Sequence, residues 1–292
     1  MKLALLGLGK MGIEVGAQLL RSGHSLTVYN RTAASAEPLL DQGARLASTP
    51  AQAAADCEIA LTAVLDDAAL RSITEGPDGI LAGLPKGAVH AGLSTISVAL
   101  ARELASAHAA QGQHYASIPM LGRPDAARER RLVMIAGGDQ ATLDRLQPVL
   151  AAIGRTTFVA GPEPWHGNLF KLCSNFMISG VLEAFGEAQA VVRKANLDPT
   201  TFVALASEFF ASPIYRNYGT LMVEERFSPP GGTLALGLKD NGLLLDAAGE
   251  LRAPMPLASL VRDQMLAAMA AGFADVDWTS LGTTAQRNAG LA

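Results

Sequence analysis

A glycine-rich segment near the start of the chain, Gly7–Gly12, has the spacing Gly-x-Gly-x-x-Gly. It follows an apolar run typical of a strand and precedes an amphipathic segment typical of a helix. In such a turn the first glycine permits the bend, the second lets the backbone approach a pyrophosphate, and the third lets helix and strand pack closely. The helix N-terminus offers unpaired N–H groups to the phosphates. The motif predicts a dinucleotide site formed by Gly7, Leu8, Gly9, Lys10, Met11 and Gly12.

The residues after the second predicted strand indicate which dinucleotide binds. An enzyme that uses NAD usually has Asp or Glu about 20 residues past the glycines, where it binds the ribose 2′-hydroxyl. Here the sequence reads Asn30-Arg31-Thr32 and contains no carboxylate. Arg31, with the side chains of Asn30 and Thr32, is suited to a 2′-phosphate. If Arg31 is only a surface charge, the missing acid has no explanation. The sequence therefore favours NADP(H).

A second candidate for chemistry lies in the middle of the chain, where Lys171 and Asn175 are four residues apart on a predicted helix. This spacing places both side chains on one helix face. An ammonium and an amide on an otherwise apolar helix are costly without a purpose. A lysine in such surroundings can have a lowered pKa that suits proton transfer. From the residues alone, a catalytic lysine and a surface lysine with a packed alkyl stem remain equal alternatives.

The composition excludes several classes of protein. With 292 residues, 49% hydrophobic, 17% charged and a net charge of −4, the chain is not disordered, and it has no basic stripe for nucleic acid or an anionic membrane. The five histidines and two cysteines lack the spacing of a metal site or a disulfide framework. No apolar run reaches the roughly 18 residues of a membrane span. We therefore expect a cytoplasmic protein without a metal.

The elements that must position these residues follow from the pattern of the first half. Strands are predicted at Lys2–Leu6 and Ser25–Tyr29, and then near residues 59–64, 88–92, 114–119 and 132–136, with helical segments between them. The last helix of this half ends near Ile153. Alternation of strands and helices at this spacing predicts a mainly parallel sheet with helices on both faces.

The second half has almost no strand signal. A hinge is predicted at residues 161–164, and nothing breaks a helix between His166 and Lys194. This helix of about 29 residues, roughly 43 Å long, is apolar around much of its circumference and must be covered by later helices or by a second subunit. Later helices are predicted near residues 199–211, 213–225, 233–248 and 256–271. The sequence predicts an α/β domain, residues 1–162, followed by an all-α C-terminal domain, residues 163–292.

Five segments recur together in one order and spacing: Gly7–Gly12, Leu93–Ser97, Pro119–Gly122, Gly167–Asn175 and Lys239-Asp240. In these segments the chain resembles the β-hydroxyacid dehydrogenases over essentially its whole length. That family includes 3-hydroxyisobutyrate dehydrogenase and the glyoxylate/succinic semialdehyde reductases. The resemblance implies a Rossmann domain, a helical C-terminal domain, a homodimer or homotetramer, and a site in the cleft between the domains.

The resemblance also implies residue roles. Lys171 matches the catalytic lysine that protonates the substrate oxygen during reduction, and Asn175 matches an asparagine that positions the substrate. By the resemblance, Val64, Leu65, Thr95 and Lys239 contact the cofactor, in addition to Asn30, Arg31 and Thr32, which the missing carboxylate already indicates. The candidate substrate contacts are Ser94, which matches a family position, and the altered loop residues Leu121, Gly122 and Arg123.

Two positions depart from the family pattern. Gly92 stands where the family commonly has Asp, and Leu121 stands where a serine helps to hold the substrate carboxylate. An isobutyl group cannot donate a hydrogen bond, and the loss of one donor to a charged group costs about 1.5–3 kcal/mol. Arg123 either supplies a different anion contact or faces solvent. The changed loop is similar to that of the imine reductases, but those relatives generally lack the lysine that is present here as Lys171.

Three functions are therefore compared. The leading one is an NADPH-dependent reductase of a small aldehyde or keto compound, or the reverse oxidation of a β-hydroxyacid. The second is an imine reductase with an apolar pocket. The third is a non-catalytic NADP-binding protein, against which the paired Lys171 and Asn175 argue.

Overall fold

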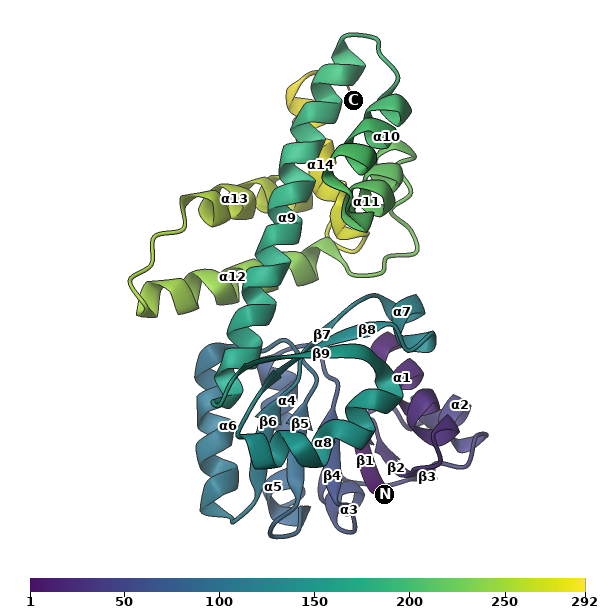
Figure 1. Ribbon diagram of the computed structural model, residues 1–292, viewed down its shortest axis with the longest axis vertical. Helices are drawn as coiled ribbons and strands as arrows, with labels where there is room; N and C mark the ends of the chain where they lie inside the picture. The colour runs from purple at the N-terminus through teal and green to yellow at the C-terminus, as the bar shows by residue number, and fades with distance from the viewer. Residues whose placement is uncertain (292) are drawn as a thin grey trace. The chain divides into compact units, whose positions relative to one another are not determined.

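The computed structural model describes residues 1–291, and the chain divides into two compact units, Met1–Lys171 and Leu172–Ala292 (Figure 1). The division falls within one long helix, α9 (Pro164–Lys194). The predicted domain boundary, after residue 162, lies just before this helix begins. Among residues 1–291, no helix combines the length and the apolarity that a bilayer crossing needs.

The first unit contains a sheet in which the described strands run in the order β3-β2-β1-β4-β5-β6-β8-β7, with β9 paired to β8. Pairing is parallel except where β8 meets β6 and β7. This arrangement confirms the predicted mainly parallel sheet. The strands are β1 (Lys2–Leu6), β2 (Ser25–Tyr29), β3 (Arg45–Leu46), β4 (Ile59–Thr62), β5 (Val89–Gly92), β6 (His114–Ser117), β7 (Met120–Leu121), β8 (Leu132–Gly137) and β9 (Gly154–Gly161).

Both faces of this sheet are covered, as the near-continuous apolar run in β1 requires. Leu3 and Leu5 belong to one core cluster, whereas Ala4 and Leu6, which alternate with them, belong to another. The first unit is thus an α/β unit with both faces of its sheet covered, as predicted. Its helices are α1 (Lys10–Arg21), the 3₁₀ turn η1 (Ala33–Ala36), α2 (Glu37–Leu40), α3 (Pro50–Ala54), α4 (Asp67–Thr74), α5 (Ile80–Gly83), α6 (Val98–Ala110), α7 (Pro124–Arg128) and α8 (Gln140–Ile153).

The second unit is helical, which confirms the predicted all-α half. Besides most of α9, it contains α10 (Pro199–Phe210), α11 (Pro213–Val223), α12 (Leu234–Glu250), α13 (Pro256–Ala270), the 3₁₀ turn η2 (Trp278–Leu281) and α14 (Gly282–Asn288). Gly186 on α9 allows a tight contact, because a Cβ there would lie 2.5 Å from the Cα of Gly282. Leu182 and Phe185 of α9 contribute to the core of this unit.

The sequence interpretation was wrong in several local details, and the two-residue strands β3 and β7 are among the elements it missed. It missed β9, an exposed strand whose Phe158 and Val159 lack the alternation of a half-buried strand. After the strand Ser25–Tyr29, where a helical segment is predicted, η1 and a short α2 are found with Pro38 in the first turn. It also missed α14, because the sequence of this buried helix (GTTAQRN) is mostly polar.

A buried row of side chains crosses the interior of the first unit from β4 to α6. Thr62 Oγ1 lies 2.9 Å from His90 Nε2, His90 Nδ1 lies 2.8 Å from His108 Nε2, and His108 Nδ1 lies 2.7 Å from Gln113 Oε1. Burial lowers the pKa of His108 from 6.5 to about 4, and burial together with His108 lowers the pKa of His90 well below 6.5. Both rings are therefore neutral in the folded protein near neutral pH.

This row predicts a loss of stability in mild acid. Between pH 6.5 and 4 the unfolded chain binds protons at His90 and His108 that the folded chain does not bind, so the free energy of unfolding falls as the pH falls. His108 alone contributes a loss of roughly 3 kcal/mol by pH 4. Urea unfolding across this range should show a shallower pH slope for His108→Gln. The variant of the exposed His114, His114→Gln, should keep the native slope, and an equal slope in both variants would contradict the assignment.

Candidate active site

The glycine-rich turn connects β1 to α1, and its glycines have different structural needs. Gly7 has φ +96°, and a Cβ there would overlap the carbonyl oxygen of Ala63. A Cβ on Gly12 would overlap the carbonyl oxygen of Gly7. A Cβ on Gly9, by contrast, would meet nothing within 4 Å. Packing therefore requires two of the three glycines, whereas the space beside Gly9 is open to a ligand.

The open space lies at the N-terminus of α1, which has the features of an anion site. Gly9 is the N-cap residue and has no side chain that could accept from the first-turn N–H groups. The first turn contains no acidic residue. Unpaired N–H groups and the helix dipole favour a pyrophosphate in this position. The residues present therefore fit a dinucleotide.

Asn30 links this turn to the segment after β2. Its Oδ1 accepts a hydrogen bond from the backbone N–H of Leu8 at 3.0 Å, and its Nδ2 donates to the carbonyl of Thr32 at 3.0 Å. Both ends of the amide thus contact backbone, a tie between the two loops that the sequence interpretation did not anticipate. Arg31 follows directly and is exposed.

A chain of hydrogen bonds connects the loops after β4 and β5 to the start of α9. Ser94 is buried, and its Oγ accepts from the N–H of Val64 at 2.8 Å. Two residues later, the N–H of Ile96 donates to Oδ1 of Asn168 at 3.2 Å. Asn168 is completely buried, and its Nδ2 has no hydrogen-bond partner among the described residues. A buried unsatisfied donor of this kind requires a specific explanation, such as a ligand or a water.

The first turns of α9 lie directly against the sheet. A Cβ on Gly167 would be 2.7 Å from the carbonyl oxygen of Ser117, at the end of β6. A Cβ on Gly137, at the end of β8, would be 2.5 Å from the N atom of Gly167. Lys171 follows one turn later and is only 8% exposed. Lys171 is thus buried and not an exposed lysine of the surface.

The loop predicted to hold the substrate anion surrounds β7. Leu121 pairs with Val133 of β8, and the next residue, Gly122, has φ +138°, which favours glycine. Arg123 is the N-cap residue of α7. The absence of Asp at position 92 also has a steric reason, because a Cβ on Gly92 would lie 2.7 Å from the hydroxyl of Tyr115.

The helical unit contains a second group of polar residues. Asn175, one turn beyond Lys171 on α9, is buried and donates through Nδ2 to Oδ2 of Asp240 at 2.6 Å. Oδ1 of Asp240 lies 3.0 Å from Nζ of Lys239. The sequence alone indicates no role for Asp240. It contacts two predicted site residues at once, and the sequence signal for it was the Lys239-Asp240 pair.

From this hydrogen bond we expect Asp240 to position the side chain of Asn175. Asp240→Ala should lower kcat about ten- to a hundredfold, because Asn175 loses a charge-assisted hydrogen bond worth about 1.5–3 kcal/mol. Cofactor affinity, measured by fluorescence titration, should change far less than kcat. The matched control is Asp246→Ala on the same helix, α12, and equal losses in both variants would contradict the role.

Comparison with known proteins matches each half of the chain to a family model of NAD(P)-dependent dehydrogenases. The family model described as the NAD binding domain of 6-phosphogluconate dehydrogenase matches residues 2–161, and the model described as the NAD-binding domain of NADP-dependent 3-hydroxyisobutyrate dehydrogenase matches residues 166–283. The chain belongs to the 3-hydroxyisobutyrate dehydrogenase-related family of NAD(P)-dependent oxidoreductases. This finding confirms the resemblance seen in the sequence.

Individual relatives support the assignment along the full length. An uncharacterized oxidoreductase of Bacillus subtilis is 40% identical, covering 96% of this chain and 98% of its own. The 3-sulfolactaldehyde reductase of Escherichia coli is 31% identical, and the match covers 99% of this chain and 97% of the reductase. The crystal structure of 3-hydroxyisobutyrate dehydrogenase from Salmonella typhimurium is similar with a TM-score of 0.87 at 25% identity, covering 97% and 99%. The matches place the chain among NAD(P)-dependent dehydrogenases that act on CH–OH groups.

Proposed function

We propose that the protein is an NADPH-dependent reductase of a small aldehyde or keto compound, which also oxidises the corresponding hydroxyacid. The observation that carries this proposal is the buried Lys171 at the start of α9. Gly167 holds this part of the helix against the sheet, and Asn168 ties it to the loop that carries Ser94 and Thr95. A proton donor is therefore fixed in the same unit as the dinucleotide turn.

The chemistry divides between cofactor and protein. When bound, NADPH supplies a hydride from C4 of its nicotinamide, and this hydride adds to the carbonyl carbon. The Lys171 ammonium gives a proton to the carbonyl oxygen, so that the C=O bond becomes CH–OH. Asn175, anchored by Asp240, orients the substrate. The turn Gly7–Gly12 and the N-terminus of α1 hold the pyrophosphate.

For the substrate we propose an aldehyde with a small anionic group, and we propose that Arg123 binds this group. Leu121 cannot donate a hydrogen bond to an anion, and Arg123 lies two residues further on, at the N-cap of α7. The E. coli relative is named as a reductase of a sulfonated aldehyde, which supports this class. The test is a panel of carboxylated and sulfonated aldehydes, neutral ketones and cyclic imines. Turnover of the anionic aldehydes is expected, and turnover of imines alone would make the protein an imine reductase instead.

The preference for NADP(H) rests on Arg31. Arg31→Ala should raise KM for NADPH about ten- to a hundredfold, the effect of losing a charge-assisted contact to the 2′-phosphate. KM for NADH should stay within about threefold of its native value, because NADH has no 2′-phosphate. Parallel titrations with both cofactors measure the two changes. The exposed Arg45→Ala on β3 is the control, and an equal effect of Arg31→Ala on NADH would contradict the proposal.

We further propose a cytoplasmic homodimer or homotetramer, assembled through the helical unit. Met177 of α9, Phe210 of α10 and Leu257 of α13 are exposed and line one apolar hollow of about 390 Å³. The neighbouring Phe209 is 78% exposed and packs edge-on against Phe210. Exposed aromatic and methionine side chains of this kind are enriched at subunit interfaces. Light scattering should give the mass of two or four chains, and a monomer would contradict the proposal.

A further inference from the structure

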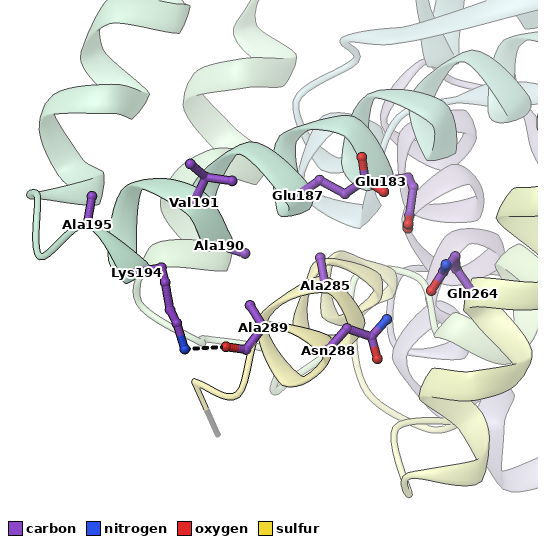
Figure 2. Close-up of a pocket in the computed structure, with 10 residues that line it drawn as sticks. All are labelled: Glu183, Glu187, Ala190, Val191, Lys194, Ala195, Gln264, Ala285, Asn288 and Ala289. Atoms are coloured by element: carbon purple, nitrogen blue, oxygen red, sulfur yellow. Dashed lines mark hydrogen bonds between the residues drawn. The ribbon is translucent and has the colours of Figure 1, made fainter.

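A second pocket lies wholly within the helical unit and plays no part in the proposed reaction (Figure 2). It has a volume of about 530 Å³ and lies between the C-terminal half of α9 and the helices α13 and α14. Half of its ten lining residues have small apolar side chains. Its lining residues are Glu183, Glu187, Ala190, Val191, Lys194, Ala195, Gln264, Ala285, Asn288 and Ala289.

Glu183 is the unusual member of this lining. Its side chain is directed into the pocket, toward the amide of Gln264 (Figure 2), yet the residue is only 4% exposed. Neither carboxyl oxygen has a hydrogen-bond partner among the described residues. A buried ionised carboxylate without a partner is strongly unfavourable. Either the group is protonated, or a ligand supplies the missing partner.

The surroundings of Glu183 favour a positive ligand. The carboxylate of Glu187, one turn further along α9, is directed toward Glu183 (Figure 2). Burial and this second negative charge raise the pKa of Glu183 to about 7. The remaining charged group in the lining is Lys194, whose Nζ donates to the carbonyl of Ala289 at 2.7 Å, at the end of the pocket away from Glu183.

The pocket suits an organic cation better than a metal ion. Calcium needs six to eight oxygen ligands, and magnesium needs six in strict geometry. The described residues contain no group of three His, Cys, Asp or Glu side chains that could hold a metal. The alanines and Val191 offer an apolar wall that a metal ion would not use but an alkyl chain would.

We propose that this pocket binds an alkylammonium ion, with its charged head between Glu183, Glu187 and Gln264 and its alkyl chain along the alanines of α9 and α14. The head satisfies both orphaned oxygens of Glu183 through charge-assisted hydrogen bonds. The pocket lies beyond Asn175 on α9 and shares no residue with the proposed catalytic group, so its occupancy and the reductase activity can be tested separately.

The test is calorimetric titration of the full-length protein with hexylammonium, with 1-hexanol and hexanoate as probes of the same length. Saturable binding of one hexylammonium per chain is expected, with much weaker binding of hexanol and hexanoate. Glu183→Gln keeps the shape of the side chain but not its charge, and it should weaken hexylammonium binding at least about tenfold. The matched control is Glu208→Gln on α10 of the same unit, which should bind as the native protein does. Thermal unfolding shows that each variant is folded.

Three results would overturn the proposal. One is the absence of saturable hexylammonium binding in the native protein. Another is equal affinity of the native protein for hexylammonium and hexanol, or equal affinity of Glu183→Gln and the native protein for hexylammonium. Either result would mean that the pocket is only an apolar hollow. The third is a change in oligomeric mass on Glu183→Gln without any amine binding, which would assign the pocket to a basic side chain of a second copy.

Discussion

Replacing Lys171 by methionine is expected to lower kcat for aldehyde reduction by about 10²–10⁴, the usual contribution of a positioned general acid. Methionine has nearly the length of lysine and is apolar, so it fills the buried position without supplying a proton. The affinity for NADPH should be nearly unchanged, because the dinucleotide turn is formed by β1 and α1 and not by α9. Steady-state kinetics and a fluorescence titration of NADPH measure the two quantities.

The control for this variant is Lys86→Met, the same chemical change at an exposed lysine of the first unit. It should leave kcat and KM at their native values. If Lys171→Met were as active as Lys86→Met, Lys171 would have no role in proton transfer. If the variant lost NADPH binding together with activity, the loss would reflect a damaged fold instead.

The second large effect is expected at the glycine-rich turn, where two single-methyl changes should separate cofactor binding from folding. Gly9→Ala should weaken NADPH binding on the order of a hundredfold, because its methyl group fills the space next to the α1 N-terminus and displaces a charge-assisted phosphate contact. Its free energy of unfolding should change by less than about 1 kcal/mol, since Gly9 has an extended backbone and no neighbour within 4 Å of the added Cβ.

Gly12→Ala should behave differently. Its Cβ would overlap the carbonyl oxygen of Gly7, so the variant should lose about 1–3 kcal/mol of folding stability as well as cofactor affinity. Urea unfolding without cofactor, together with NADPH titration, distinguishes the two variants. Equal cofactor affinity in Gly9→Ala and the native protein would show that the pyrophosphate does not lie at Gly9.

Much of the fold could be predicted because the strongest signals are local. The apolar run Lys2–Leu6 and the unbroken apolar pattern leading to Lys194 correspond to β1 and α9 almost to the residue. The missed elements depend on distant partners. Residues 154–161 form a strand only because β8 offers a free edge, and the polar α14 is buried because Gly282 meets Gly186 of α9.

In the candidate site, too, local motifs could be predicted from the sequence, whereas contacts between residues far apart in the sequence could not. The spacing of Gly7–Gly12 is a local pattern and predicted the dinucleotide turn directly. Asn168 and Asp240 could not be assigned roles from spacing, because each acts on a residue more than 60 positions away, Ile96 and Asn175 respectively. The double tie made by Asn30 is also a tertiary feature, since its partner Leu8 belongs to another loop.

We propose that the protein reduces a carbonyl group with a hydride from NADPH and a proton from Lys171. The most direct measurement is to run the reaction of an anionic aldehyde with NADPH deuterated at C4 and to locate the label in the product by NMR. One deuterium is expected on the former carbonyl carbon, which is now part of a primary alcohol. Lys171→Met should strongly reduce the rate at which this label appears. NADPH binding without transfer of the label to any carbonyl compound, or transfer only to imines, would show that the protein is not a carbonyl reductase.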